Sequence, residues 1–415
     1  MNMLLREKVN HMIEESLAEV MPDNAVEKAL KNFHGAGGRT VLVAAGKAAW
    51  QMAAAAVRVL GHVDDGIVIT KYGHVKGKIP GVDCREAGHP VPDENGFTAT
   101  KMALQKVSNL HENDTVIFLL SGGGSALFEN PLISGEELQD ITRQLLACGA
   151  DIVEMNIIRK RLSGVKGGRF ALACMPAQVY AVVLSDILGD PLDMIASGPA
   201  YPDSSTCDQA KYILAKYDLK LSEKAVALLQ QETPKNLTNV TTRITGSVRE
   251  LCRAVERSAQ KLGFEPVILT EELCCEAREA GSMMASILRT HAKEDRKLCY
   301  IAGGETVVHL VGRGKGGRNQ ELALAAAPGI AGMKNACVFS FGSDGTDGPT
   351  DAAGGYVDGE TVELLRDKGL DVFQTLQNND SYTALKAADG LIITGPTGTN
   401  VNDVTVALFD YEIDM

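Results

Sequence analysis

Residues 115–127 read TVIFLLSGGGSAL, and they indicate the class of fold expected for the whole chain. The run Thr115–Leu120 is apolar without alternation, as in a parallel strand that is covered on both faces. Ser121–Ser125 follows at once with three consecutive glycines, which let the backbone turn sharply and approach a ligand closely. This stretch therefore predicts a buried strand that ends in a ligand-binding turn and leads into a helix.

The same order of apolar run, small-residue turn and helical pattern recurs along the chain. Further runs of this kind are Thr40–Ala45, Ile67–Thr70, Val179–Leu184, Pro266–Leu269, Leu298–Ala302 and Cys337–Phe341. Strands separated by helical patterns predict βαβ units, so we expect an α/β fold built largely on parallel strands. A chain of 415 residues exceeds the roughly 250–300 residues of a single core, so two domains are expected. The charged segment Pro202–Val240 is expected to hold a helix and the connector between them.

The amino-acid composition disfavours nucleic acids and membranes as binding partners. The formal net charge is −12, and such a field repels nucleic acids and anionic membranes. No stretch approaches the ~20 apolar residues of a membrane span, and Met1–Val20 has the spacing of an amphipathic helix rather than a signal peptide. The sequence predicts a cytoplasmic protein that acts on small molecules.

Two glycine-rich segments carry cations in spite of the acidic composition. Met155–Phe170 holds five cations and ends in Lys166-Gly167-Gly168-Arg169, and Gly312–Gln320 reads GRGKGGRNQ. Glycines beside cations are typical of backbone approach to an anion, which points to a nucleoside triphosphate. The residues predicted to bind its phosphates are Ser121, Gly122, Gly123, Gly124, Ser125, Lys166, Gly167 and Gly168.

The second of these segments raises an alternative. Gly312, Gly314 and Gly317 match the dinucleotide pattern G-x-G-x-x-G between a strand-like run and a helical pattern. The basic residues among these glycines, and the lack of an acidic residue closing a clean second strand about 20 positions on, favour a phosphate ligand over a dinucleotide. A lone match of this kind is weak evidence.

Acidic residues follow two other predicted strands. Asp344, Asp347 and Asp351 lie in one loop, and carboxylates with hydroxyls suit Mg²⁺, so these three are predicted metal ligands. Asp186 follows Val179–Leu184 and joins the same pool of carboxylates, from which a base for a hydroxyl proton would come.

Two further residues stand at strand or turn positions. Lys47 ends the first predicted strand, but Val41 and Ala48 break the Walker A pattern, so this is no P-loop. A lysine at this position can act as a point charge on a phosphate, but taken alone a solvated lysine at a helix start is the favoured interpretation. His89, in the turn GHPVP, could contact a substrate, but a structural role is favoured.

In combination these motifs resemble the glycerate 2-kinases of the MOFRL type. The resemblance runs from about residue 5 to 408 and rests on the segments Ala45–Ala48, Gly88–Pro90, Ser121–Ala126, Asn156 with Arg161, Lys166–Arg169, Ser185-Asp186, Ser197–Pro199, Gly303–Glu305, Gly316–Glu321, Ser343–Gly348 and Gly395–Asp403.

That resemblance implies two α/β domains with the active site in the cleft between them. Residues 1–235 would form an N-terminal domain on a Rossmann-like parallel sheet, and residues 241–415 a smaller C-terminal MOFRL domain. The implied reaction moves the γ-phosphoryl group of ATP to the C2 hydroxyl of D-glycerate, with Mg²⁺. Some relatives are labelled hydroxypyruvate reductases, so an NAD(P)H-dependent reductase is the alternative, and a non-catalytic nucleotide-binding module is the third class.

The resemblance also implies which residues act in catalysis. Lys47 and Arg318 match residues that are important for activity in relatives, and with Asp186 they form the predicted catalytic set. The predicted contacts to the hydroxy acid are Arg161, Arg169, Glu305, Asn319 and Asn400. The sequence leaves the oligomeric state open, with a homodimer as one alternative.

Overall fold

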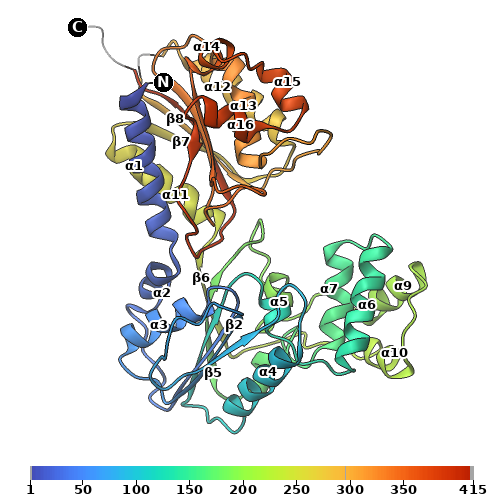
Figure 1. Ribbon diagram of the computed structural model, residues 1–415. Coiled ribbons are helices and arrows are strands. Elements are labelled where there is room, and N and C mark those ends of the chain that lie inside the picture. Colours follow the sequence, from blue (N-terminus) through green and yellow to red (C-terminus); the bar gives the residue numbers. More distant parts are fainter. Residues whose placement is uncertain (1, 295, 412–415) are drawn as a thin grey trace. The chain divides into compact units, whose positions relative to one another are not determined.

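The computed structural model describes residues 2–294 and 296–411, and these form two compact units (Figure 1). The N-terminal unit is Pro22–Thr245, and the C-terminal unit joins Met1–Met21 to Gly246–Met415. This division differs from the expected ranges 1–235 and 241–415, because α1 (Met3–Val20) packs on α11 (Val248–Lys261). Its apolar stripe is buried there, and Glu15 accepts a hydrogen bond of 2.7 Å from Ser258.

The N-terminal unit is built on a six-stranded sheet in the order β3-β2-β1-β4-β5-β6. Its strands are β1 (Thr40–Ala45), β2 (Asp65–Lys71), β3 (Asp83–Ala87), β4 (Thr115–Leu120), β5 (Gln178–Leu184) and β6 (Val240–Gly246). The pairs β1–β2, β2–β3, β1–β4 and β4–β5 are parallel. The order is that of the doubly wound nucleotide-binding folds, in which ligands bind where the strand order reverses.

Alternate residues of β1 enter two different cores, which explains its unbroken apolar sequence. Val41 and Val43 pack in one core with α4 (Glu94–Val107), and Leu42 and Ala44 pack in another with α3 (Ala49–Leu60). A strand covered on both faces has no polar side, as the sequence predicted. The remaining elements around this sheet are α2 (Pro22–Leu30), α5 (Gly124–Leu127), α8 (Arg169–Cys174) and the 3₁₀ turn η1 (Ile195–Ser197).

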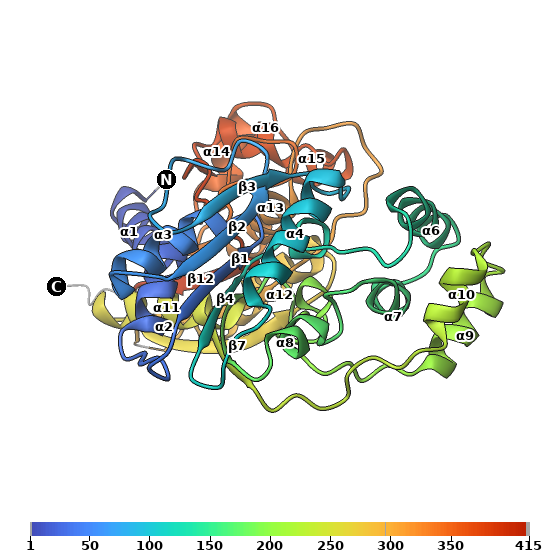
Figure 2. The same ribbon diagram turned by 90° about the horizontal axis from the view of Figure 1, so that it is seen from below.

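Four helices form a separate cluster beside this sheet (Figure 2). They are α6 (Gly135–Ala147), α7 (Ile152–Leu162), α9 (Cys207–Lys216) and α10 (Glu223–Leu229), and they share one apolar core. The expectation of a helix and an inter-domain connector over Pro202–Val240 was therefore wrong for most of that segment. Its charged residues lie on the outer faces of α9 and α10, whose inner faces carry Ile213 and Leu229.

The smaller C-terminal unit has a six-stranded sheet in the order β11-β10-β9-β12-β8-β7. Its strands are β7 (Glu265–Leu273), β8 (Leu298–Gly304), β9 (Ala336–Gly342), β10 (Gly354–Asp358), β11 (Leu391–Ile392) and β12 (Asp403–Phe409). Only β7–β8 is parallel among the described pairs, and β12 runs antiparallel between β8 and β9. The expectation of parallel strands was wrong here, since burial on both faces produces the same apolar runs whichever way a strand points.

Helices cover both faces of this second sheet (Figure 1). With α1 and α11 on one face, the others are α12 (Ala277–His291), α13 (Arg318–Ile330), α14 (Thr361–Asp367), α15 (Val372–Gln377) and α16 (Ser381–Ala387). No helix within residues 2–294 and 296–411 is both long and apolar enough to cross a membrane.

Candidate active site

The reversal of strand order in the N-terminal unit falls between β1 and β4, and the predicted loop lies there. The amide of Lys47 donates to the carbonyl of Gly122 at 2.9 Å, and the amide of Ala48 donates to Ser121 Oγ at 3.1 Å. Gly46 has φ of +125°, and a Cβ on it would lie 2.2 Å from Ser121 Oγ. The two strand ends therefore approach so closely that only glycine is accommodated at this position.

Three amides of the Ser121–Ser125 loop have no partner among the described residues. Gly124 donates to the carbonyl of Ser121 at 3.3 Å, whereas the amides of Gly122, Gly123 and Ser125 make no hydrogen bond. Successive unpaired N–H groups in a turn bind anions. This geometry supports the predicted phosphate-binding role of Ser121–Ser125.

Side chains from three other segments surround this loop. A Cβ on Gly122 would lie 2.3 Å from Asp186 Oδ2, and one on Gly123 would lie 3.2 Å from Lys47 Cγ and 3.0 Å from the His89 ring. The structure thus brings together three predicted features: Lys47, the glycine loop and Asp186. It also adds His89, which the sequence suggested to be structural; its place in the turn before α4 was the only signal.

The surroundings of Lys47 leave its ammonium accessible, unlike the buried Lys160 and Lys166, which are held by carboxylates. The Lys47 side chain is exposed, and no described residue forms an ion pair with its ammonium. Its carbonyl accepts hydrogen bonds from Thr70 Oγ1 at 3.2 Å and from His74 Nδ1 at 3.0 Å, which fix the backbone. Burial, and then repulsion by Lys47, lowers the pKa of His89, so this ring is neutral at pH 7.

The basic segment 155–170 turns inward, contrary to the prediction for two of its cations. Lys166 is fully buried and donates to Glu129 Oε2 at 2.5 Å, and Arg161 is fully buried and donates to Ser205 Oγ at 2.8 Å. A buried cation is retained only when it is paired, and here the partners are protein groups. The buried Nε of Arg161 has no partner among the described residues, but the other nitrogens of both side chains bond to protein groups. We therefore leave Lys166 and Arg161 out of the candidate site.

The glycines and the arginine that follow Lys166 are likewise engaged. The amides of Gly167 and Gly168 donate to the carbonyls of Ser197 and Gly198 at 3.0 and 2.8 Å. Arg169 Nη1 donates to the carbonyl of Ser163 at 2.9 Å. These contacts hold the start of α8 in place, and we leave Gly167, Gly168 and Arg169 out of the site as well.

Arg318, at the first position of α13, lies at a different site, within the C-terminal unit. Its Nε and Nη2 donate to the carboxylate of Asp403 at 2.5 and 3.0 Å, and its Nη1 lies 2.8 Å from Glu305 Oε1. Asp403 begins β12 and is paired with Gly304 at the end of β8, which places Glu305 beside it. Two adjacent strands of opposite direction thus supply the two carboxylates.

Electrostatics hold Arg318 charged and oriented. Burial raises the pKa of Asp403 to about 6 in spite of Arg318. Burial would lower the pKa of Arg318, but Asp403 and then Glu305 outweigh it and raise that pKa. The Arg318 side chain remains 35% exposed, so part of the guanidinium is accessible. Sequence reasoning did not assign Asp403, since the pairing joins residues 85 positions apart.

Asp347, a predicted metal ligand, is the cap of α13. Its buried carboxylate accepts from the amides of Asn319 and Gln320 at 3.2 and 2.9 Å, and from Gln320 Nε2 at 2.9 Å. The side chain of Asn319 is also buried, and it accepts from Ser340 Oγ at 2.6 Å. We therefore assign Asp347 and Asn319 to positioning the start of α13, where Arg318 lies.

The other predicted residues of this unit lie in loops. Asp351 accepts a hydrogen bond of 2.8 Å from Tyr382, and Asn400 Oδ1 accepts from the amide of Asn402 at 3.3 Å. Asp344 Oδ1 accepts from the amide of Thr346 at 3.0 Å. Within the described residues no three His, Cys, Asp or Glu side chains form a metal-binding group, so the three aspartates do not make a site alone.

The first amides of the G-x-G-x-x-G segment are occupied, whereas those of Gly316 and Gly317 make no hydrogen bond to a described residue. The amides of Val311 and Gly312 both donate to Asn379 Oδ1 at 2.9 Å, and that of Gly314 donates to the carbonyl of Asn378 at 2.8 Å. The amide of Lys315 donates to Asp380 at 3.0 Å. A dinucleotide fold needs such amides for the pyrophosphate, so this geometry disfavours a dinucleotide. The phosphate role of the segment stays a prediction.

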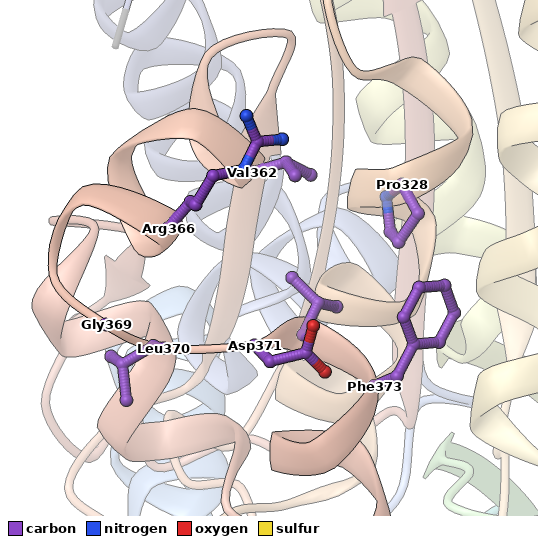
Figure 3. Close-up of a pocket in the computed structure, with 8 residues that line it drawn as sticks. Pro328, Val362, Arg366, Gly369, Leu370, Asp371 and Phe373 are labelled. Atoms are coloured by element: carbon purple, nitrogen blue, oxygen red, sulfur yellow. The ribbon is translucent and has the colours of Figure 1, made fainter.

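A depression of about 390 Å³ on the C-terminal unit lies elsewhere (Figure 3). Its wall includes Pro328 of α13, Arg366 of α14 and Phe373 of α15. None of the predicted site residues lines it, and we do not include it in the candidate site.

Comparison with known proteins agrees with this arrangement. Residues 8–230 match the model described as a domain of unknown function, DUF4147, and residues 298–403 match the MOFRL family. The chain is 52% identical to a D-glycerate 2-kinase from Thermotoga maritima, over 97% of this chain and 98% of that protein. A crystal structure of glycerate kinase from the same organism matches with a TM-score of 0.94 and 52% identity, covering 98% of this chain and 99% of that one.

The relatives also bear on the alternative. A protein from Agrobacterium vitis that carries a provisional hydroxypyruvate reductase name is 40% identical, over 89% of this chain and 99% of its own length. The reductase name is thus provisional and comes at lower identity than the kinase name. On this evidence the chain belongs to the MOFRL-type glycerate 2-kinase family.

Proposed function

We propose that this chain is an ATP-dependent D-glycerate 2-kinase, which forms 2-phosphoglycerate and ADP. The observation that carries the proposal is the set of three unpaired amides in the Ser121–Ser125 loop, beside Lys47 and Asp186, at the reversal of strand order. Phosphoryl transfer requires mainly positioning and neutralisation of charge, which such a loop supplies. The kinase names of the relatives support the same conclusion.

The proposed chemistry assigns a task to each group. The amides of Gly122, Gly123 and Ser125 bind phosphate oxygens of ATP, and Lys47 binds the group being transferred. The C2 hydroxyl oxygen of glycerate forms a bond to the γ-phosphorus, and the bond from that phosphorus to the bridging oxygen breaks as ADP leaves. Asp186 accepts the hydroxyl proton, because its carboxylate lies against Gly122 and therefore beside the loop that binds the phosphates.

In the C-terminal unit we assign Arg318 to the same reaction. Its guanidinium is fixed by Asp403 and Glu305, and it would stabilise charge on the transferred phosphoryl oxygens. Glu305 acts here through Arg318, and Asn400 stays a predicted substrate contact.

Mg²⁺ in kinases neutralises phosphate charge, and it is usually held by one or two carboxylates together with phosphate oxygens. Asp347 and Asp351 are committed to protein partners, whereas Asp344 Oδ2 makes no hydrogen bond to a described residue. We propose that Asp344 holds the ion. A cytoplasmic location and a homodimer likewise stay predictions.

The test is an assay with ATP, Mg²⁺ and D-glycerate coupled to enolase alone, which consumes 2-phosphoglycerate but not the 3-isomer. Signal with enolase alone is expected. A signal that appears only after phosphoglycerate mutase is added would place the phosphate on C3 and overturn the proposal. Parallel reactions with NAD(P)H and hydroxypyruvate test the reductase, and ATP binding without turnover in any assay would leave a binding module.

A further inference from the structure

A small pocket of the N-terminal unit adjoins the phosphate-binding loop. It has a volume of about 120 Å³, and its wall includes Gly123, Ser125, His89 and Arg159. Sites for drug-sized ligands occupy roughly 300–1,000 Å³, so this one has room only for a small molecule. It lies where the acceptor of a phosphoryl group would be needed, next to the loop amides.

Arg159 is the cation of α7 that the fold leaves unpaired. Its neighbour Lys160 is buried against Asp203 at 3.1 Å, and Arg161 is fixed by Ser205. The guanidinium of Arg159 makes no hydrogen bond or ion pair with any residue described in the structure. Arg159 is half-buried, and this burial lowers its pKa, opposed by Glu129.

The charges around the pocket leave one positive charge in excess. Glu129 also lines the pocket, but it accepts the hydrogen bond of the fully buried Lys166, so its charge is compensated. His89 is neutral at pH 7 and adds no charge. Arg159 thus shares its nearest carboxylate, Glu129, with Lys166, and the two cations exceed it by one charge. Such an excess on a half-buried guanidinium is unfavourable, and a bound anion would remove that cost.

Resting on the proposed kinase function, we propose that Arg159 binds the carboxylate of the hydroxy-acid acceptor and thereby selects acids over neutral alcohols. A guanidinium binds a carboxylate through two parallel hydrogen bonds. One excess charge matches one carboxylate, and the pocket volume matches a three-carbon acid rather than a nucleotide. Ser125 and His89 supply neutral polar groups for its hydroxyls.

Arg159→Gln tests this assignment. We expect the KM for D-glycerate to rise about 10- to 100-fold, the loss typical of charge-assisted hydrogen bonds, while the KM for ATP changes less than about twofold. Arg159→Lys keeps the charge but cannot form two parallel hydrogen bonds, so its KM for D-glycerate should lie between those of wild type and Arg159→Gln. Arg143→Gln is the matched control, because Arg143 lies on α6 with a side chain that is 75% exposed. Thermal unfolding of each variant checks that it is folded.

A neutral acceptor separates charge recognition from a general loss of activity. The ratio of kcat/KM for D-glycerate to that for D-glyceramide should fall at least about tenfold in Arg159→Gln, because only the acid uses the guanidinium. An unchanged ratio would overturn the assignment. A KM that rises for ATP instead of glycerate would also overturn it and would indicate that Arg159 binds a nucleotide phosphate.

Calorimetric titration distinguishes failure of this inference from failure of the kinase proposal. D-glycerate is titrated into wild type and Arg159→Gln, with and without a non-hydrolysable ATP analogue. If wild type forms no 2-phosphoglycerate but binds D-glycerate through Arg159, the kinase proposal fails and the carboxylate site stands. Equal binding by both proteins, or no binding by wild type in either condition, rejects the carboxylate site.

Discussion

At the scale of single residues, the two proposed catalytic cations differ in how they are held. Lys47 is exposed, and no described residue pairs with its ammonium, so it can adjust to a moving phosphoryl group. Arg318 is fixed by Asp403 and Glu305, with its guanidinium oriented before a ligand arrives. Preorganised charge of this kind needs little rearrangement during reaction.

Lys47→Ala should lower kcat about 10²- to 10³-fold, as when one charge-stabilising group is removed from an active site. Its stability should stay near that of wild type, since the ammonium has no described partner to lose. Enolase-coupled rates and thermal unfolding measure the two effects. The exposed Lys101 on α4 provides the control Lys101→Ala, and equal rates in both variants would remove Lys47 from the mechanism.

Asp403 gives a pH-dependent signature. Its folded pKa of about 6 lies above the ordinary 3.8, so the folded protein keeps this proton while the unfolded chain has lost it. This group therefore reduces the free energy of unfolding as pH rises from about 4 to 6. Asp403→Asn lacks that dependence, so the stability of the variant relative to wild type should increase over the same window. Urea unfolding at several pH values measures it, and a flat or falling difference would contradict the raised pKa.

At the scale of elements, the strand-end loops work because the backbone passes within contact distance of side chains. Gly122 lies against Asp186, and Gly46 against Ser121. A methyl group at either position must displace a neighbour of the anion-binding amides. These loops therefore control activity through backbone position rather than through side-chain chemistry.

Gly122→Ala should reduce kcat/KM at least about tenfold while the fold remains intact, because its Cβ would lie 2.3 Å from Asp186 Oδ2 and either group must shift. Gly35→Ala is the control, since its Cβ meets Thr115 Oγ1 at an ordinary 3.7 Å. Steady-state kinetics and circular dichroism compare the two. Normal kinetics in Gly122→Ala would show that the loop tolerates displacement.

At the scale of the whole molecule, the C-terminal unit is made of two separate stretches of the chain, and the N-terminal unit lies between them in sequence. Helix α1 belongs to the C-terminal unit, where its apolar stripe packs with α11. Helix α1 thus packs with elements that follow it in the sequence only from residue 246 onward.

Met12→Ala should destabilise the protein by about 2–5 kcal/mol, because Met12 is 0% exposed and its removal leaves a cavity. Met3→Ala, at a position that is 62% exposed, should change stability by less than about 0.5 kcal/mol. Chemical unfolding followed by circular dichroism measures both. A small effect of Met12→Ala would mean that α1 contributes little to its unit.

The sequence by itself determined the parts that depend on local order. The apolar runs became β1, β4, β5, β8 and β9, and the glycines of 121–125 became a turn with unpaired amides. Apolar periodicity and glycine content act within a few residues, so both can be read along the chain. The family likewise followed from the order of short motifs, and the comparisons confirmed it.

Only the tertiary structure decided which charges are available to a ligand. Lys166 and Arg161 looked equivalent to Arg159 in the sequence, but Glu129 and Ser205, 37 and 44 positions away, engage the first two and leave Arg159 unpaired. Asp403 and Arg318 meet across 85 positions, and β12 runs antiparallel to both β8 and β9. Charge pairing depends on distance in space and on burial, and neither is a property of a stretch of sequence.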